Sequence, residues 1–155
     1  MTREEKLAFK HSLKQFCQAV IEQRIQNGKA LIDSAQQAAN NEEKSSAGDK
    51  YETARAMGHL DKDMHTRQLM ENVKELANLQ QVNATQVYAG VTTGAYIQCS
   101  TTSFFIAAGI GRQVYNGQPI VFLSPGAPLA KLMMGKQAGD SFVFGGSSAV
   151  IEDVF

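Results

Sequence analysis

The first eighty residues carry apolar and small side chains at steps of three and four positions, the spacing of one face of an α-helix. Before residue 40 the pattern includes Leu13, Phe16, Cys17, Val20, Arg24, Asn27, Gly28, Leu31, Ala35 and Ala38. After residue 50 a second, less regular stripe includes Tyr51, Ala54, Met57, Leu60, Asp61, Met64, Leu69, Val73, Leu76 and Leu79. Each stripe predicts one long helix.

A polar stretch from Asn40 to Gly48 separates the two stripes and is rich in residues that form turns. Two helices joined by so short a link are expected to run antiparallel and to bury their stripes against each other, as in a coiled coil. From Asp49 to Leu79 the second helix would extend about 45 Å at 1.5 Å per residue. Periodicity does not distinguish a hairpin that reaches into a partner from one that dimerises or separates domains.

Beyond residue 80 the pattern changes, because short apolar runs alternate with turn residues. This half holds all three prolines and ten of the thirteen glycines. We expect strands at 87–93, 95–100, 104–107, 120–123, 141–144 and 149–155, a turn at Asn116-Gly117, and a short helix at 128–134 that Gly135 ends. The sequence thus predicts an α+β protein. An antiparallel two-helix coiled-coil hairpin would span 1–80, with an acidic tip near 41–52, and a small antiparallel β-sheet domain with one short helix would span 81–155.

Charge and composition narrow the classes of function. Fifteen basic and fifteen acidic residues cancel, so contact with nucleic acid would have to come from a local patch. No apolar run approaches the ~18 residues of a membrane span, and residues 1–15 lack the apolar core of a secretion signal, so we expect a cytoplasmic protein with no membrane partner. Cys17 and Cys99 have no second ligand at metal-binding spacing, which predicts reduced, structural thiols.

One segment carries a recognisable motif. The run from Ser124 to Asp140 reads SPGAPLAKLMMGKQAGD: a Ser-Pro turn, a second proline that opens a short helix, and then Gly-Lys-x-x-Gly-Asp before a strand. It resembles the C-terminal domain of the Gre transcript cleavage factors of bacteria. The resemblance implies an FKBP-like fold that docks on RNA polymerase at the rim of its secondary channel. The implied docking residues are Ser124, Pro125, Pro128 and Lys136.

The expected tip of the hairpin is similar to the same family. Gly48-Asp49-Lys50-Tyr51-Glu52-Thr53-Ala54 matches the family's Gly-Asp-x-x-Glu-Asn-Ala, with Asp49 and Glu52 on the acidic pair. The resemblance implies that the hairpin enters the polymerase channel and lends these carboxylates to the polymerase's own Mg²⁺ centre, which cuts the extruded RNA 3′ end of a backtracked elongation complex. Asp49 would be the metal ligand, in complex with polymerase only, and Glu52 would hold a water or accept a proton. The chain would have no cofactor of its own and would not itself be an enzyme.

Three cations lie close to that pair in sequence. Lys44, Lys50 and Arg55 are candidates for contact with RNA phosphates, although exposed Lys and Arg are most often only solvated.

Several alternatives stay open. Asp-x-x-Glu at a helix start is also a capping box, in which Asp49 and Glu52 satisfy free backbone N–H groups. The family usually continues Asn-Ala-Glu-Tyr where this chain has Thr53-Ala54-Arg55-Ala56. A regulator that occupies the polymerase channel without cleaving RNA is therefore the second reading. A prolyl isomerase or peptide-binding domain is the third, suggested only by the implied fold.

Overall fold

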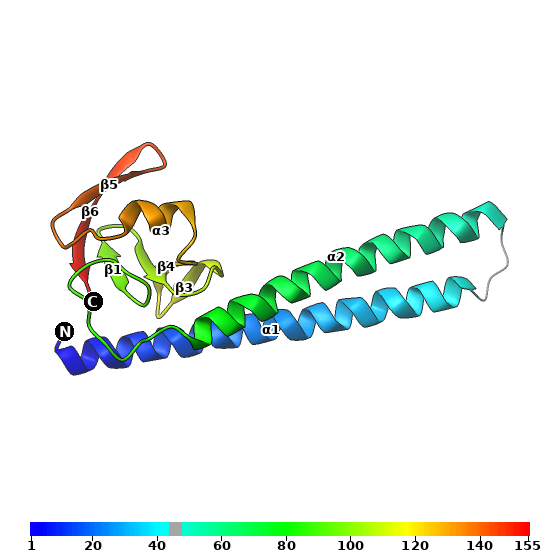
Figure 1. Cartoon of the computed structure of the whole chain (residues 1–155), viewed down its shortest axis with the longest axis horizontal. Helices are drawn as coiled ribbons and strands as arrows, with labels where there is room; N and C mark the ends of the chain where they lie inside the picture. Colours follow the sequence, from blue (N-terminus) through cyan, green and yellow to red (C-terminus); the bar gives the residue numbers. More distant parts are fainter. Residues whose placement is uncertain (44–47) are drawn as a thin grey trace. The chain divides into compact units, whose positions relative to one another are not determined.

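The structure, a computed structural model, describes the backbone of residues 1–43 and 48–155 and the side chains outside 42–51 (Figure 1). Its helices are α1 (Arg3–Glu43), α2 (Gly48–Gln80) and α3 (Pro128–Met133). Its strands are β1 (Tyr96–Cys99), β2 (Ser103–Ile106), β3 (Gly111–Tyr115), β4 (Gln118–Leu123), β5 (Ser141–Phe144) and β6 (Ser147–Val154). The predicted α+β class, with a helical hairpin followed by a sheet and one short helix, is confirmed. No helix in the described residues is long and apolar enough to span a bilayer.

Backbone contacts divide the chain into two compact units, each described by itself below. One unit, here the hairpin unit, is Ile21–Lys74. The other, here the sheet unit, combines Met1–Val20 with Glu75–Phe155. The first turns of α1 therefore group with the sheet. The division predicted from sequence, at residue 80, stays a prediction.

Small residues let the two helices of the hairpin unit approach closely. A Cβ atom built on Gly28 of α1 would lie 3.6 Å from Cδ1 of Leu69 on α2, and one built on Gly58 of α2 would lie 3.8 Å from Cβ of Ala39 on α1. As the residue number rises along α1, its partner's number falls along α2 by the same amount. The two pairs thus define one antiparallel register.

Polar groups share this interface with the small residues. The Lys62 ammonium donates a hydrogen bond to the side-chain oxygen of Gln36 at 2.6 Å. Further along α2, the buried Nδ1 atom of His65 has no hydrogen-bond partner within the described part of the chain. Because unsatisfied buried polar atoms cost free energy, the contact is less stabilising than an apolar seam of the same length.

The apolar stripes predicted from sequence were partly wrong. On α1 the hairpin unit buries Ile21 and Ile25, whereas the predicted Leu31 is 47% exposed. On α2 the predicted Leu69 does lie at the interface, beside Gly28, together with Gly58 and Lys62, whereas other apolar residues of the predicted stripe do not. The exposed residues are Met57 at 62%, Leu60 at 66%, Met64 at 48% and Val73 at 44%.

The six strands form one sheet in the order β3-β4-β2-β1-β6-β5. The sheet is mixed, whereas the sequence predicted a wholly antiparallel one, because β4 pairs parallel to β2 with Ser103 opposite Ile120. β3 was not predicted as a strand, although the turn that joins it to β4 was. That turn has positive φ at Asn116 (49°) and Gly117 (77°), which suits a tight hairpin.

The strand predicted at 87–93 was wrong. This segment makes only an isolated bridge between Gly90 and Gln137. Val91 donates its N–H to the Lys136 carbonyl at 2.8 Å, and Gly135 donates to the Val91 carbonyl at 2.9 Å. The segment is therefore a linker tied to the end of α3, with too few ladder bonds to make a strand.

The two faces of the sheet have different covers. One face packs on α3, through a core that includes Ile97, Phe104, Ile106, Ala130, Met133, Phe142, Ile151 and Val154. The other face meets the first turns of α1. There Phe9 packs edge-on to Tyr96 with ring centroids 4.9 Å apart, and Phe16 lies 5.2 Å from Tyr115 and 5.7 Å from Phe122.

Two lysines of α1 hold the linker that follows α2. Lys10 is fully buried and donates to the Gln86 carbonyl at 2.6 Å, while its ammonium lies 4.5 Å from the centre of the Tyr88 ring. Lys14 donates to the Val82 carbonyl at 2.8 Å. Burial lowers the pKa of Lys10 from 10.5 to about 8.

A glycine in this linker offers a direct test of the packing. At Gly94 φ is +90°, and an added Cβ would lie 2.6 Å from the backbone oxygen of Asn83. We expect Gly94→Ala to lower the free energy of unfolding by about 2–4 kcal/mol, because the conformation is strained and the neighbour is backbone. Denaturant unfolding measures this. The control, Gly126→Ala, meets nothing within 4 Å and should change stability by less than about 0.5 kcal/mol. Equal effects of the two substitutions would contradict the packing.

The buried Lys10 predicts a dependence of stability on pH. Its folded pKa of about 8 lies below the ordinary value of 10.5, so between these values the unfolded chain binds more protons. The cost of the buried charge is fully present below pH 8 and is removed as pH rises to 10.5. The loss of this cost raises the free energy of unfolding by up to about 3 kcal/mol, because each unit of difference between the folded and unfolded pKa corresponds to about 1.4 kcal/mol.

Comparison with Lys10→Met isolates this contribution, because methionine keeps an apolar stem and cannot titrate. We expect the difference in unfolding free energy between wild type and Lys10→Met to change between pH 7.5 and 10.5, in favour of wild type at high pH. Denaturant unfolding at four or five pH values measures it. A difference that stays constant with pH would show that Lys10 keeps an ordinary pKa.

Candidate functional site

The acidic pair predicted at the tip lies at the start of α2. This helix begins at Gly48, so the backbones of Asp49 and Glu52 lie in its first two turns. The side chains of Asp49, Lys44 and Lys50 lie outside the described residues, so the predicted metal, phosphate and capping roles of these residues stay predictions. Glu52, Arg55 and Ala56 are described and are all exposed.

The second predicted region, Ser124–Asp140, forms the connection from β4 through α3 to β5. The Ser124 carbonyl accepts the N–H of Ala127 at 3.1 Å, which closes a turn directly before the helix. Pro128 then occupies the first turn of α3, where its fixed φ suits a helix and its missing N–H is not needed. The structural reason predicted for this proline is confirmed.

The end of α3 also follows the prediction. Gly135 takes φ = +79°, as expected of a glycine that terminates a helix. The Asp140 carboxylate accepts the N–H of Gln137 at 2.8 Å and closes the turn in which Gly139 takes φ = +93°. Hydrogen-bonded turns thus flank the short helix on both sides. The segment Ser124–Asp140 is here the bracket.

Within this bracket the predicted docking residues differ in exposure. Pro128 is exposed, and Ser124, Pro125 and Lys136 are half-buried. The Lys136 backbone is fixed on both sides, because its N–H donates to Met133 at 3.0 Å and its carbonyl accepts from Val91 at 2.8 Å. The four residues therefore lie on one fixed segment, at the two ends of α3.

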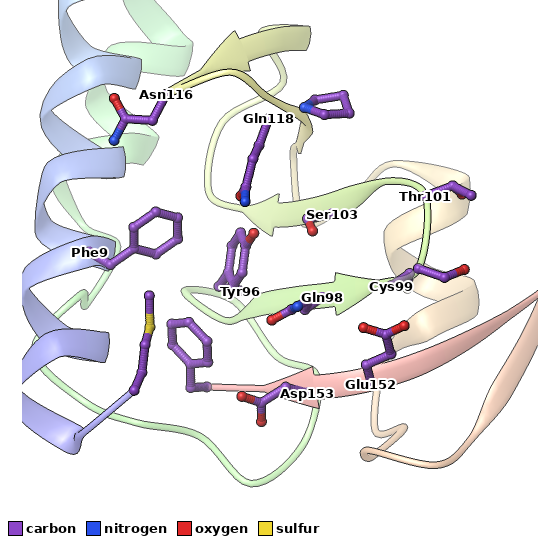
Figure 2. Close-up of a pocket in the computed structure, with 14 residues that line it drawn as sticks. Phe9, Tyr96, Gln98, Cys99, Thr101, Ser103, Asn116, Gln118, Glu152 and Asp153 are labelled. Atoms are coloured by element: carbon purple, nitrogen blue, oxygen red, sulfur yellow. The ribbon is translucent and has the colours of Figure 1, made fainter.

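A pocket that the sequence did not predict lies in the sheet unit, between the start of α1 and the ends of β1, β2 and β6 (Figure 2). Its volume is about 570 Å³, within the range of small-ligand sites. Phe9, Tyr96 and Phe155 form an aromatic wall, with centroid distances of 4.9 Å from Phe9 to Tyr96 and 5.1 Å from Tyr96 to Phe155. Gln98 and Ser103, which are paired across β1 and β2, supply polar groups.

An irregularity in β6 shapes the acidic side of this pocket. Gln98 of β1 pairs with Asp153, but the next residue, Cys99, pairs with Ile151, so Glu152 is an extra residue in β6. Such a β-bulge redirects side chains. Ile151 and Val154 both join the core beneath α3, while Glu152 and Asp153 both line the pocket. In Figure 2 the Glu152 carboxylate points from β6 toward β1.

Burial affects the pKa values of two residues that line the pocket, Cys99 and Tyr96. Burial raises the pKa of the Cys99 thiol, and the charge of Glu152 raises it further. Burial also raises the pKa of Tyr96, against a hydrogen bond with Ser103 that lowers it. Since the thiolate is the reactive form of cysteine, a raised pKa lowers the reactivity of Cys99. Cys17 is likewise a buried thiol.

The described residues contain no group of three or more His, Cys, Asp or Glu side chains that could hold a metal ion.

Comparison of the chain with protein-family models, with curated proteins and with solved structures finds no match.

A spacing in the sequence could have indicated the β-bulge beside this pocket. The two apolar residues of Ile151-Glu-Asp-Val154 are three apart, whereas a regular strand buries residues at even spacing. That spacing in a strand implies a bulge, with both acids on the opposite face.

Proposed function

We propose that this chain binds RNA polymerase through the polymerase's secondary channel and stimulates cleavage of backtracked RNA. The polymerase would perform the cleavage with its own active site, so the chain would act as a transcription elongation factor and not as an enzyme. One observation carries the proposal: Asp49 and Glu52 start the second helix of a packed antiparallel hairpin, in a chain that also holds the Ser124–Asp140 motif. Both motifs resemble the Gre factors, whose C-terminal domain is FKBP-like.

The dimensions of the helices support this role. With 33 residues α2 is about 50 Å long at 1.5 Å per residue, enough to reach a buried active site through a channel. Close contacts at Gly28 and Gly58 keep the pair of helices narrow. A narrow rod suits insertion better than a bulky one would.

The donor set suits a shared metal. Mg²⁺ binds through one or two carboxylates together with phosphate oxygens and waters, and a second such ion stabilises the attacking and leaving oxygens of a phosphodiester displacement. In this chain Asp49 would supply the ligand, and Glu52, three residues on, is a neighbour on a helical surface and is exposed to a partner. Lys44, Lys50 and Arg55 would contact the phosphates of the RNA 3′ end.

The bracket around α3 would dock on the polymerase surface. It presents Pro128 and the partly exposed Ser124, Pro125 and Lys136 on a segment with little freedom to rearrange. A fixed surface loses little conformational entropy on binding, which favours affinity.

A second candidate function is a regulator that occupies the channel without cleaving RNA. Arg55 and Ala56, which replace an acidic residue and an aromatic residue of the family pattern, are both exposed on α2 just after Glu52. A cation beside the pair would compete with Mg²⁺ for the carboxylates. In this case the chain would bind the polymerase but would release no RNA fragments.

The decisive experiment uses the cognate RNA polymerase stalled in a backtracked state, with RNA resolved by length after the chain is added. We expect wild type to release 3′ fragments and Asp49→Asn to reduce the rate by about 100-fold, since the amide keeps the shape and removes the charged ligand. The matched control is Asp63→Asn, an exposed aspartate on the same helix, which should cleave at the wild-type rate.

The alternatives give different results in the same assay. Binding without fragments at any Mg²⁺ concentration would favour the non-cleaving regulator. Absence of binding to polymerase would overturn both candidate functions.

A further inference from the structure

Acidic and amide side chains, and no cationic side chain among the described residues, line the pocket of the sheet unit, together with Met1, which carries the N-terminal amino group. The lining includes the Glu152 and Asp153 carboxylates and the side-chain amides of Gln98, Asn116 and Gln118, and none of the described residues that line it is Lys, Arg or His. With two negative charges and several carbonyl oxygens, the pocket favours a ligand that is positively charged and rich in N–H donors.

Of the two carboxylates, only that of Asp153 forms an ion pair within the described residues. Asp153 already pairs with the Lys6 ammonium at 3.3 Å. Glu152 is exposed, and no cation of the described residues forms an ion pair with it. The β-bulge nevertheless directs it to the pocket, when a regular strand would have directed it to the opposite face from Asp153. One charge of the pocket is thus left for an external partner.

Lys6 shows how a cation fits beside this wall. Its ammonium contacts the Asp153 carboxylate and also lies 5.0 Å from the centre of the Phe155 ring. Carboxylate and aromatic ring together are the usual surroundings of a bound cation. The lining of the pocket also includes a carboxylate and a partly exposed ring, because Glu152 and Phe9 lie on opposite sides of it (Figure 2).

We propose that this pocket binds the guanidinium group of an arginine side chain presented by a partner polypeptide. A guanidinium carries five N–H donors in a planar fork that can reach a carboxylate and several amide oxygens at once, which a compact ammonium cannot do. The volume of about 570 Å³ admits the side chain together with neighbouring residues of the peptide. Glu152 pairs with the guanidinium, and Gln98 and Gln118 accept its remaining N–H groups.

The test is an NMR titration of the ¹⁵N-labelled full chain with the peptide acetyl-Gly-Arg-Gly-amide. The control peptide carries citrulline, which has nearly the same shape without the charge. We expect saturable shifts at the amides of Gln98, Ser103 and Glu152 with arginine, at least tenfold weaker binding with citrulline, and weaker arginine binding as NaCl rises from 50 to 500 mM. Saturable binding of both peptides with equal affinity, or no saturable shift at these amides, would overturn the proposal.

Substitution identifies the carboxylate. Glu152→Gln should weaken binding of the arginine peptide at least tenfold, whereas the matched control Glu71→Gln, at an exposed position of α2, should leave it unchanged. Unaltered affinity in Glu152→Gln would assign the binding elsewhere. If Glu152→Gln alters the spectrum beyond its neighbours, the salt and citrulline comparisons on wild type still decide. The proposal does not depend on RNA polymerase, so these outcomes are separate from those of the cleavage assay.

Discussion

Both faces of the β-sheet carry apolar side chains, and each must be covered if the sheet is to be stable in water. A helix of six residues, α3, covers one face, and the second falls to the first turns of α1. Other features depend on this contact. It buries the Lys10 stem and directs its ammonium to the linker carbonyl of Gln86. It also leaves a pocket beyond Phe9, where the aromatic cover meets the polar ends of the strands.

The hairpin unit is held by a different kind of contact. Within the described residues its helices meet where Gly28 faces Leu69, where Gly58 faces Ala39 and through the Lys62–Gln36 hydrogen bond, and α1 also buries Ile21 and Ile25. Several apolar residues of α2 are nevertheless exposed, namely Met57, Leu60, Met64, Met70 and Val73.

The sequence predicted the elements well where local chemistry decides them. Pro128, Gly135 and the Asn116-Gly117 turn took the conformations expected of those residues, because proline and glycine act on their own backbone. It failed where tertiary pairing decides. β2 and β4 pair in parallel, so the chain between them must cross over, and no short sequence motif predicts such a connection. The helix interface was misplaced because a search for apolar residues overlooks Gly28 and Gly58. Sequence motifs predicted two of the candidate sites, the tip and the bracket. Predicting the pocket would have required recognising that Glu152 is an extra residue in β6, which shifts the register of the strand.

Charge distinguishes the tip from the pocket within a chain whose charges cancel overall. At the tip, acids and bases alternate over a few residues: Lys50, Glu52 and Arg55 follow Asp49 closely. Such a mixture suits a partner that itself combines phosphate with a metal ion, since each sign has a counterpart. The pocket has acids and amides with Lys6 at its margin, so it suits a cation alone. Because one site belongs to the hairpin unit and the other to the sheet unit, a single substitution can remove either charge pattern without changing the other. The tip and the pocket therefore carry different charge patterns within a chain whose formal net charge is zero.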